Sequence, residues 1–357
     1  MNVMHPAQQR DFDEASMLQG GVETGPATSA REWSRRLSSY RVANNRNALF
    51  EIAVTVIPLA GLWIAMWFAL QVHPVLALLL AIPTAAFLVR LFMVQHDCGH
   101  GSFFSRQWMN DWTGRAISVL TLTPYGLWRH THALHHAGSG CLDHRGHGDV
   151  DTLTVGEYVA LTRWQKLRYR LYRHPLVLFG LGPAWLFLIQ HRFPFGLMRK
   201  GWQPWASAMG TNLALLLSGA VMSWLIGPGT FLLLFVPVTL IAASIGVWLF
   251  FVQHQFENTV WQPAAQWNRQ DAALHGSSHY DLPPVLRWMT ANIGIHHVHH
   301  LASGIPYYNL GKVLEDHPEL RHVSRLTLGE SLSCIRLALW DDKAGRMVSF
   351  RDAAIAG

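Results

Sequence analysis

Residues 94–104, VQHDCGHGSFF, join the end of a long apolar run to a pair of histidines. His96 and His100 are four residues apart, so a helix that continues through them places both imidazoles on one face. The stretch therefore predicts a helix that leaves an apolar environment and presents two nitrogen ligands at its end. One HxxxH spacing is weak evidence in a chain with 21 histidines. It gains weight only from similar clusters elsewhere.

Two such clusters follow. Residues 130–136, HTHALHH, contain an HxxHH group, and residues 296–301, HHVHHL, contain another. Spacings of three and four put the side chains of each group on one helical face, as is typical of a helix that offers several ligands to one metal region. The three clusters together contribute eight histidines: His96, His100, His132, His135, His136, His296, His299 and His300.

The composition indicates a membrane protein. Half of the 357 residues are hydrophobic and only 14% are charged, against roughly 25% in an ordinary soluble domain. The net charge of +6 is not accompanied by a nucleic-acid-binding motif, and Lys and Arg beside membrane spans explain it more simply. Three cysteines without a spaced pattern argue against a disulfide framework or a CxxC metal site.

Four apolar segments are long enough to cross a bilayer as helices. They cover about 49–70, 75–95, 206–226 and 230–252, and short turns, QVHP and GPG, join them in pairs. Two shorter apolar pieces, 117–127 and 176–190, are broken by Pro or Gly or are too short, so we expect interfacial or re-entrant helices there. Residues 1–48 are polar and do not resemble a signal peptide.

The distribution of positive charge predicts the orientation. Neither short turn contains Lys or Arg, whereas the N-terminal, middle and C-terminal segments carry essentially all 28. The positive-inside rule then places these three segments, and all three histidine clusters, in the cytoplasm. We expect an all-α membrane protein with four transmembrane helices in two hairpins and a cytoplasmic helical cap. Its parts are a cytoplasmic N-terminal segment (1–48), a membrane-embedded domain with the histidine clusters (49–310) and a cytoplasmic C-terminal segment (311–357).

His254, in FVQHQFENTVW, is a ninth candidate ligand because it follows the fourth span much as His96 follows the second. The alternative is an ordinary amphipathic residue at the membrane surface. Nine neutral imidazoles would serve two metal ions with four or five ligands each. Such ligands argue against magnesium and calcium and leave iron, zinc, copper and nickel.

At this point the sequence resembles a known family. HDCGH, WRHTHALHH, LDHRGHGDVDTLTVGEY, FVQHQFENTVW and NIGIHHVHHLASGIPYYNL are similar, in order and spacing, to motifs of the membrane fatty acid desaturases, especially the bacterial acyl-lipid type that acts at the omega-6 (delta-12) position. The resemblance covers about residues 90–310. It implies a non-haem di-iron centre held by His96, His100, His132, His135, His136, His254, His296, His299 and His300.

Several polar residues near these motifs lie outside the family pattern. Five further histidines are interpreted as solvated or packed: His130, His144, His147, His279 and His297. Asp97, Glu257 and Asn292 are candidates for hydrogen bonding to a metal ligand or to a bound water and so orienting it, with helix capping or solvation as the alternative. Gly101, Ser102, Phe103 and Phe104 are expected to line a substrate entrance or simply to pack at the end of a span.

The resemblance implies an oxygen-dependent acyl desaturase, an oxidoreductase that uses two iron ions and O2 to form a cis double bond in a lipid-borne acyl chain. It further implies a bacterial inner-membrane protein with a cytoplasmic site and a separate electron donor of the ferredoxin or cytochrome b5 type, because the sequence carries no such domain. The acyl group is attached to a lipid, to coenzyme A or to a carrier. The alternatives are a di-iron hydroxylase of alkyl or carotenoid substrates and, less in keeping with the apolar spans, a histidine-rich metal transporter.

Overall fold

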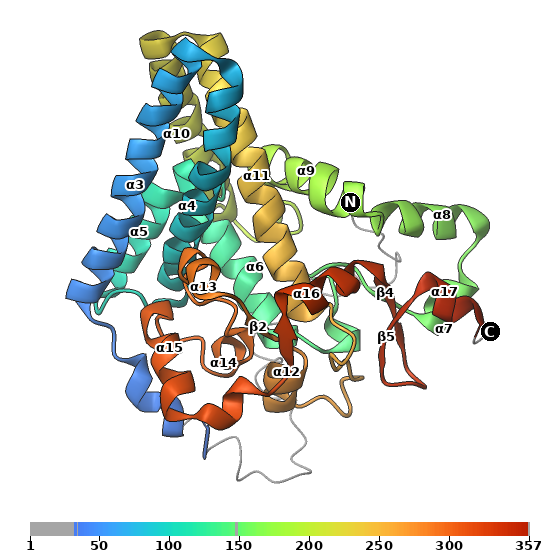
Figure 1. Ribbon diagram of the computed structural model, residues 1–357. Coiled ribbons are helices and arrows are strands. Elements are labelled where there is room, and N and C mark those ends of the chain that lie inside the picture. The colour runs from blue at the N-terminus through green and yellow to red at the C-terminus, as the bar shows by residue number, and fades with distance from the viewer. Residues whose placement is uncertain (1–31, 34, 147–148, 356–357) are drawn as a thin grey trace.

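Four long helices form the upper part of the molecule, and a cap of shorter elements lies beneath them (Figure 1). The structure is a computed structural model that describes residues 32–33, 35–146 and 149–355. The long helices are α3 (Asn45–Val72), α4 (Pro74–His100), α10 (Gln203–Ile226) and α11 (Pro228–His254). All four are long and apolar enough to cross a membrane. The predicted spans and their pairing into two hairpins are therefore confirmed.

The ends of these helices follow from their sequence. The Asn44 side chain accepts hydrogen bonds from two backbone amides of the first turn of α3, which is a standard N-cap. Pro74 and Pro228 begin α4 and α11, where a missing N–H costs nothing. Gly101 ends α4 in the left-handed conformation, with φ of 68°. The second and fourth helices therefore extend beyond the expected spans, as far as His100 and His254.

A helical pair packs against the lower half of α4. It consists of α5 (Gln107–Leu120) and α6 (Tyr125–Gly138), joined by a tight turn in which Leu122 has a positive φ of 55°. Gly114 permits the close approach, because a Cβ there would lie 2.2 Å from the ring of Tyr125. The prediction of one interfacial helix over residues 117–127 is therefore wrong. The apolar run spans the end of one helix, the turn and the start of the next.

The middle segment forms an arm that leaves the bundle sideways in Figure 1. It contains α7 (Val155–Ala160), α8 (Arg163–Tyr172), a π-helical turn η3 (Val177–Leu181), α9 (Gly182–Leu188) and a 3₁₀ turn η4 (Gln190–Arg192). Leu176 and Leu181 are 74% and 68% exposed. An apolar helix that lies across the direction of the spans agrees with the predicted interfacial helix at 176–190.

The cap is mainly helical but also contains two small sheets that the sequence did not indicate. Its helices are α12 (Arg269–His275), α13 (Pro284–Met289), α14 (His296–Leu301), α15 (Tyr307–Asp316), α16 (Leu328–Ser331) and α17 (Phe350–Ile355), with 3₁₀ turns η1 (Leu37–Arg41), η2 (Leu142–His144), η5 (Pro318–Arg321) and η6 (Leu332–Arg336). One sheet has the order β1 (Leu153–Thr154), β4 (Leu337–Asp341), β5 (Arg346–Ser349), and β1 is parallel to β4. The other pairs β2 (His279–Asp281) with β3 (Arg325–Thr327) in parallel.

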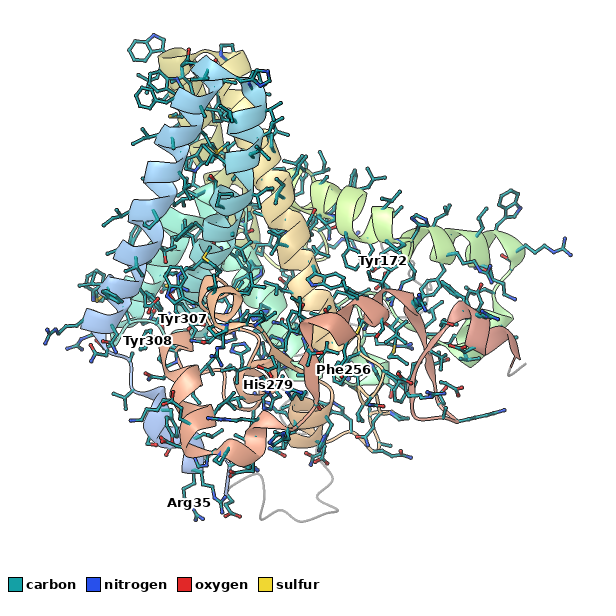
Figure 2. All side chains as sticks on the ribbon, viewed as in Figure 1. Arg35, Tyr172, Phe256, His279, Tyr307 and Tyr308 are labelled. Carbon is teal, nitrogen blue, oxygen red and sulfur yellow. The ribbon has the colours of Figure 1, made fainter. Side chains whose placement is uncertain are left out.

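A buried charged cluster joins the spans to the cap. Arg90 of α4 is 1% exposed, forms an ion pair with Glu51 of α3 and donates to the backbone carbonyl of Trp288. Its guanidinium also lies 4.0 Å from the centre of the Trp288 ring, a cation–π contact. The Tyr307 hydroxyl donates to Glu51 over 3.2 Å, and Figure 2 shows Tyr307 and Tyr308 near the lower end of α3. The cluster fixes the cap against the membrane helices.

Candidate metal centre

Nine histidines from four helices converge where the spans meet the cap. The last turn of α4 carries His96 and His100, α11 ends with His254, and α6 and α14 carry the two HxxHH groups. The nine side chains form two groups whose nitrogens lie within 4.8 Å of one another in each group. The first group is His96, His100, His132, His136 and His299, and the second is His135, His254, His296 and His300.

Short contacts between Nε2 atoms define the first group. Nε2 of His132 lies 3.0 Å from that of His96, 3.1 Å from that of His100 and 3.2 Å from that of His136. Nε2 of His299 lies 3.1 Å from that of His136. The first group thus forms where one face of α6 packs against the end of α4 and the short helix α14.

The second group is built in the same way around His254. Its Nε2 lies 3.2 Å from Nε2 of His135 and 3.0 Å from Nε2 of His296. Nε2 of His300 lies 3.1 Å from that of His296. His135 and His136 are adjacent in α6, and they point to different groups. The HH pair in the second cluster thus divides its two ligands between the two groups.

Oxygen acceptors behind three of the rings determine which nitrogen carries the proton. Nδ1 of His96 lies 3.0 Å from Asp97 Oδ1, and Nδ1 of His135 lies 2.6 Å from Asp149 Oδ1. Nδ1 of His254 lies 3.3 Å from the carbonyl of Gly276. A proton on Nδ1 leaves a lone pair on Nε2. Each group therefore has at least one imidazole whose inward nitrogen is an acceptor.

This donor set fits a metal ion. His135 and His254 both keep the proton on Nδ1, so their Nε2 lone pairs face each other at 3.2 Å with no hydrogen between them. Two such lone pairs repel unless a cation lies between them. Imidazole nitrogens bind a metal such as zinc at about 2.0–2.1 Å. Two ligands at right angles would then lie about 3 Å apart, as these nitrogens do.

Burial keeps the rings neutral. It lowers the pKa of His136, His299 and His300 well below the ordinary value, and neighbouring imidazoles, chiefly those of His300, His96 and His296 respectively, lower it further. Neutral imidazole is the form that binds metals. The site therefore offers nitrogen lone pairs near neutral pH.

The two groups also touch directly. The rings of His136 and His300 stack with centroids 4.1 Å apart and an interplanar angle of 17°. His136 belongs to the first group and His300 to the second. Behind the first group the indole of Trp128 stacks on His132 at 4.5 Å. Gly99 makes room for that indole, because a Cβ there would lie 2.6 Å from it.

Comparisons with known proteins agree with this geometry. A model of the fatty acid desaturase family matches residues 71–329, well over half of the chain. The chain belongs to the fatty acid desaturase family. It is 42% identical over 326 residues to the fatty acid desaturase of Bacillus subtilis, and the match covers 91% of this chain and 92% of that protein.

More distant desaturases have more specific names. The chain is 27% identical over 246 residues to the sn-1 oleoyl-lipid 12-desaturase of Synechocystis sp., a match that covers 64% of each chain. It is 29% identical over 237 residues to the sn-1 acyl-lipid omega-3 desaturase (ferredoxin) of Nostoc sp., covering 63% of this chain and 62% of that protein. This desaturase is accordingly an oxidoreductase of lipid metabolism and a membrane protein.

The additional histidines of this desaturase lie outside the two groups as far as the described residues show. His279 and His297 are buried, and each faces a backbone carbonyl of the cap, Arg321 at 2.7 Å and Leu320 at 2.8 Å. His130 and His144 are partly exposed. The prediction for His147 concerns a position outside the described residues. Packing explains His279 and His297, which connect β2 and α14 to the turn η5 within the cap.

The three polar candidates for supporting roles have different outcomes. Asp97 lies behind His96, and its other oxygen accepts from the backbone N–H of Tyr307 over 2.6 Å. Asn292 has a positive φ of 57° and donates to the carbonyl of Tyr307 over 3.2 Å, so it shapes the chain before and after α14. Glu257 follows the solvated alternative, because it forms a surface ion pair with Arg346 at 2.5 Å.

Three of the residues after His100 are buried. Ser102, Phe103 and Phe104 are at most 4% exposed, and Phe103 contacts the ring of Tyr307 with centroids 5.7 Å apart. The burial of these three residues fits the packing alternative, and a substrate entrance at Gly101–Phe104 stays a prediction.

Sequence reasoning missed one residue that touches the site. Asp149 lies in the loop after α6, in the motif LDHRGHGDVDTLTVGEY, which was noted for its resemblance and not for any role. Its contact with His135 shows that the motif returns to the histidines. The sequence did contain a signal, because aspartates follow the second histidine cluster closely. It could not show which of the three contacts a histidine: Asp143, Asp149 or Asp151.

Proposed function

We propose that the nine histidines bind two iron ions, five ligands at one and four at the other. With these ions the protein uses O2 to introduce a cis double bond into an acyl chain carried by a membrane lipid. The observation that carries the proposal is the convergence of nine buried imidazoles into two adjoining groups whose Nε2 atoms lie 3.0–3.2 Å apart.

Iron is favoured over the other metals that imidazole accepts. Zinc has no redox chemistry, whereas removal of hydrogen from an unactivated methylene requires a strong oxidant. Membership of the desaturase family supports a redox metal as well. Bound iron would supply the activation of O2, and the protein supplies ligands, position and exclusion of water.

The reaction balances with an external source of electrons. The substrate segment –CH2–CH2– with O2, two electrons and two protons gives –CH=CH– and two water molecules. Within the protein, Asp97 and Asp149 hold the protons on Nδ1 of His96 and His135, so that Nε2 stays available. The close-packed boundary around Phe103 and Tyr307 excludes water from that side.

The names of the relatives support the finer parts of the proposal. Those relatives act on sn-1 oleoyl-lipid or sn-1 acyl-lipid, and one carries the word ferredoxin in its name. We infer an acyl-lipid substrate that reaches the histidines from the bilayer, beside the ends of α4 and α11. We infer a ferredoxin-type donor for the electrons.

We also propose a bacterial inner-membrane location with the site on the cytoplasmic side. The turns between α3 and α4 and between α10 and α11 carry no Lys or Arg, while the cap end carries the positive charge. In Figure 1 those two turns lie at the top and the cap at the bottom.

The test is product analysis in a host that supplies a matching ferredoxin. Lipid extracts should show a loss of two hydrogens from a monounsaturated chain of about 16–18 carbons, which becomes a methylene-interrupted diene, and elemental analysis of the same preparation should find two irons per chain. A gain of one oxygen as the main product would identify a hydroxylase instead. Active protein that contains zinc and no iron would overturn the di-iron proposal.

A further inference from the structure

We propose that the electron donor docks over a basic recess in the cap and that electrons reach the metal centre through His300. The inference rests on the proposed function, because it assumes a di-iron site that receives electrons from a separate protein. It adds the surface on which that protein binds and the ligand through which the electrons would pass from the oxidised donor to the metal.

The recess has a volume of about 300 Å³ and reaches the second histidine group from the side opposite the spans. Its walls come from η1, from the start of α12 and from the end of α14 with the loop that follows. The lining residues are Arg41, Arg269, Gln270, His300, Leu301, Ala302, Ser303 and Gly304. A second hollow, beside His254 and Asp149, is too narrow to hold water.

The chemistry of the lining excludes an acyl chain and favours an anionic partner. Two guanidinium groups, an amide and a hydroxyl surround the opening, and burying methylenes among them would desolvate polar groups without compensation. Arg41 and Arg269 are both exposed. Positive charge around a concave site attracts an acidic protein surface and accelerates its association.

His300 connects the recess to both histidine groups. It lines the recess although only 4% of it is exposed. Its Nε2 lies 3.1 Å from that of His296 in the second group, and its ring stacks at 4.1 Å on His136 of the first. His300 is itself a proposed ligand of the second metal position and contacts His136, a proposed ligand of the first, so an electron that passes by way of its ring can reach either position.

The stoichiometry requires repeated docking. A donor that carries one electron per molecule, such as a [2Fe–2S] protein, is oxidised by one electron at each encounter. Two reduced donors are consumed for each double bond, with one O2 and two protons, and two water molecules are released. The first oxidised donor must leave before the second binds. A salt-sensitive electrostatic contact suits such exchange.

The experiment compares two reductants on the same purified holoenzyme. Turnover is measured with increasing reduced [2Fe–2S] ferredoxin and, separately, with reduced methyl viologen, a small cation that needs no basic docking surface. We expect the Arg269→Glu and Arg41→Glu variants to raise the KM for ferredoxin about tenfold. Arg269→Gln should have a smaller effect. Viologen-driven turnover and iron content should remain at the wild-type level.

Arg351→Glu is the matched control, because Arg351 is an exposed arginine on α17, away from α12 and α14 in Figure 1. An unchanged KM for ferredoxin in the recess variants would overturn the docking proposal and leave the desaturase activity intact. An equal fall with both reductants would also overturn it, since the arginines would then act on the metal centre itself. Wild-type protein that desaturates with neither reductant would instead contradict the proposed function.

Discussion

Oδ1 of Asp149 lies 2.6 Å from Nδ1 of His135, and both side chains are almost fully buried. Asp97 stands behind His96 in the same way, at 3.0 Å. Each histidine group therefore contains one imidazole whose Nδ1 faces a carboxylate. In the first group the carboxylate of Asp97 comes from the same helix as His96, and in the second group that of Asp149 comes from a loop. A carboxylate in this position orients the ring and makes the metal-facing nitrogen more basic.

Replacing Asp149 with Ala should weaken metal binding at the second group. Loss of such an outer partner typically costs 10–100-fold in metal affinity. We expect iron content to fall from two toward one per chain after dialysis against a chelator, measured by elemental analysis. Asp342→Ala, at an exposed position of the cap, is the control. Full retention of both irons in the Asp149 variant would show that the contact has no supporting role.

The pair formed by Arg90 and Glu51 should be essential for stability. Arg90→Leu leaves Glu51, which is 15% exposed and still accepts from Tyr307, without its cationic partner, so we expect a cost below the roughly 3–5 kcal/mol of breaking a fully buried pair. The measurement is the midpoint of thermal unfolding in detergent. The double variant Arg90→Leu, Glu51→Leu removes both charges and should recover part of the loss. A single variant as stable as the wild type would contradict this account of the boundary.

Histidines inside and outside the groups should differ sharply in their effect on activity. His132→Ala, His296→Ala and His299→Ala each remove one inward nitrogen, so desaturation should fall by more than the roughly 100-fold limit for losing an outer partner. His144→Gln should leave product formation largely intact, because His144 belongs to neither group. Mass spectrometry of lipid extracts makes the comparison. Normal activity of His296→Ala would remove the argument for metal ligation.

Orientation can be tested by labelling single cysteines with a membrane-impermeant reagent. Cysteines at Val72 and Gly229, beside the two short turns, should react from the outside, and one at Ala344 should react only after the membrane is opened. The three native cysteines are buried and give little background. Gly140 is unsuitable as a cap probe, because it has a φ of 76° and a Cβ would lie 3.1 Å from that of Ala272. Labelling of Val72 and Ala344 from the same side would refute the hairpin arrangement.

The spans and the gathering of histidines in three short clusters are the parts that local sequence predicts well, whereas the division into two groups came from the structure. An apolar run of membrane length has few structures available to it, and the spacing within HxxHH fixes which side chains share a helical face. The distribution of Lys and Arg predicted that all three clusters lie on one side of the membrane, and the family resemblance implied that they meet at one centre. His297 was set aside because the family pattern does not require it, and in the six-residue helix α14 its ring points to the carbonyl of Leu320 and not to either histidine group.

Long-range pairings were not accessible in the same way. Strand β1 pairs with β4 across almost two hundred residues, and each strand is too short to show an alternating pattern. The partners of Arg90 could not be predicted from local sequence either, because Glu51 lies in another helix and Trp288 lies in the cap. The sequence left two roles open for Glu257, because proximity in sequence to His254 does not indicate the direction of a side chain after a helix ends.

The ligand order along the chain restricts when the centre can form during biosynthesis. The first group runs from His96 to His299 and the second from His135 to His300, so both sets become complete within one residue of each other. The helices α3, α4, α10 and α11 are all synthesised before either set exists, because they precede α14 in the chain. If the proposed ligand sets are right, nascent chains that stop before residue 299 carry neither complete set, and both metal positions can be filled completely only after α11 has been made.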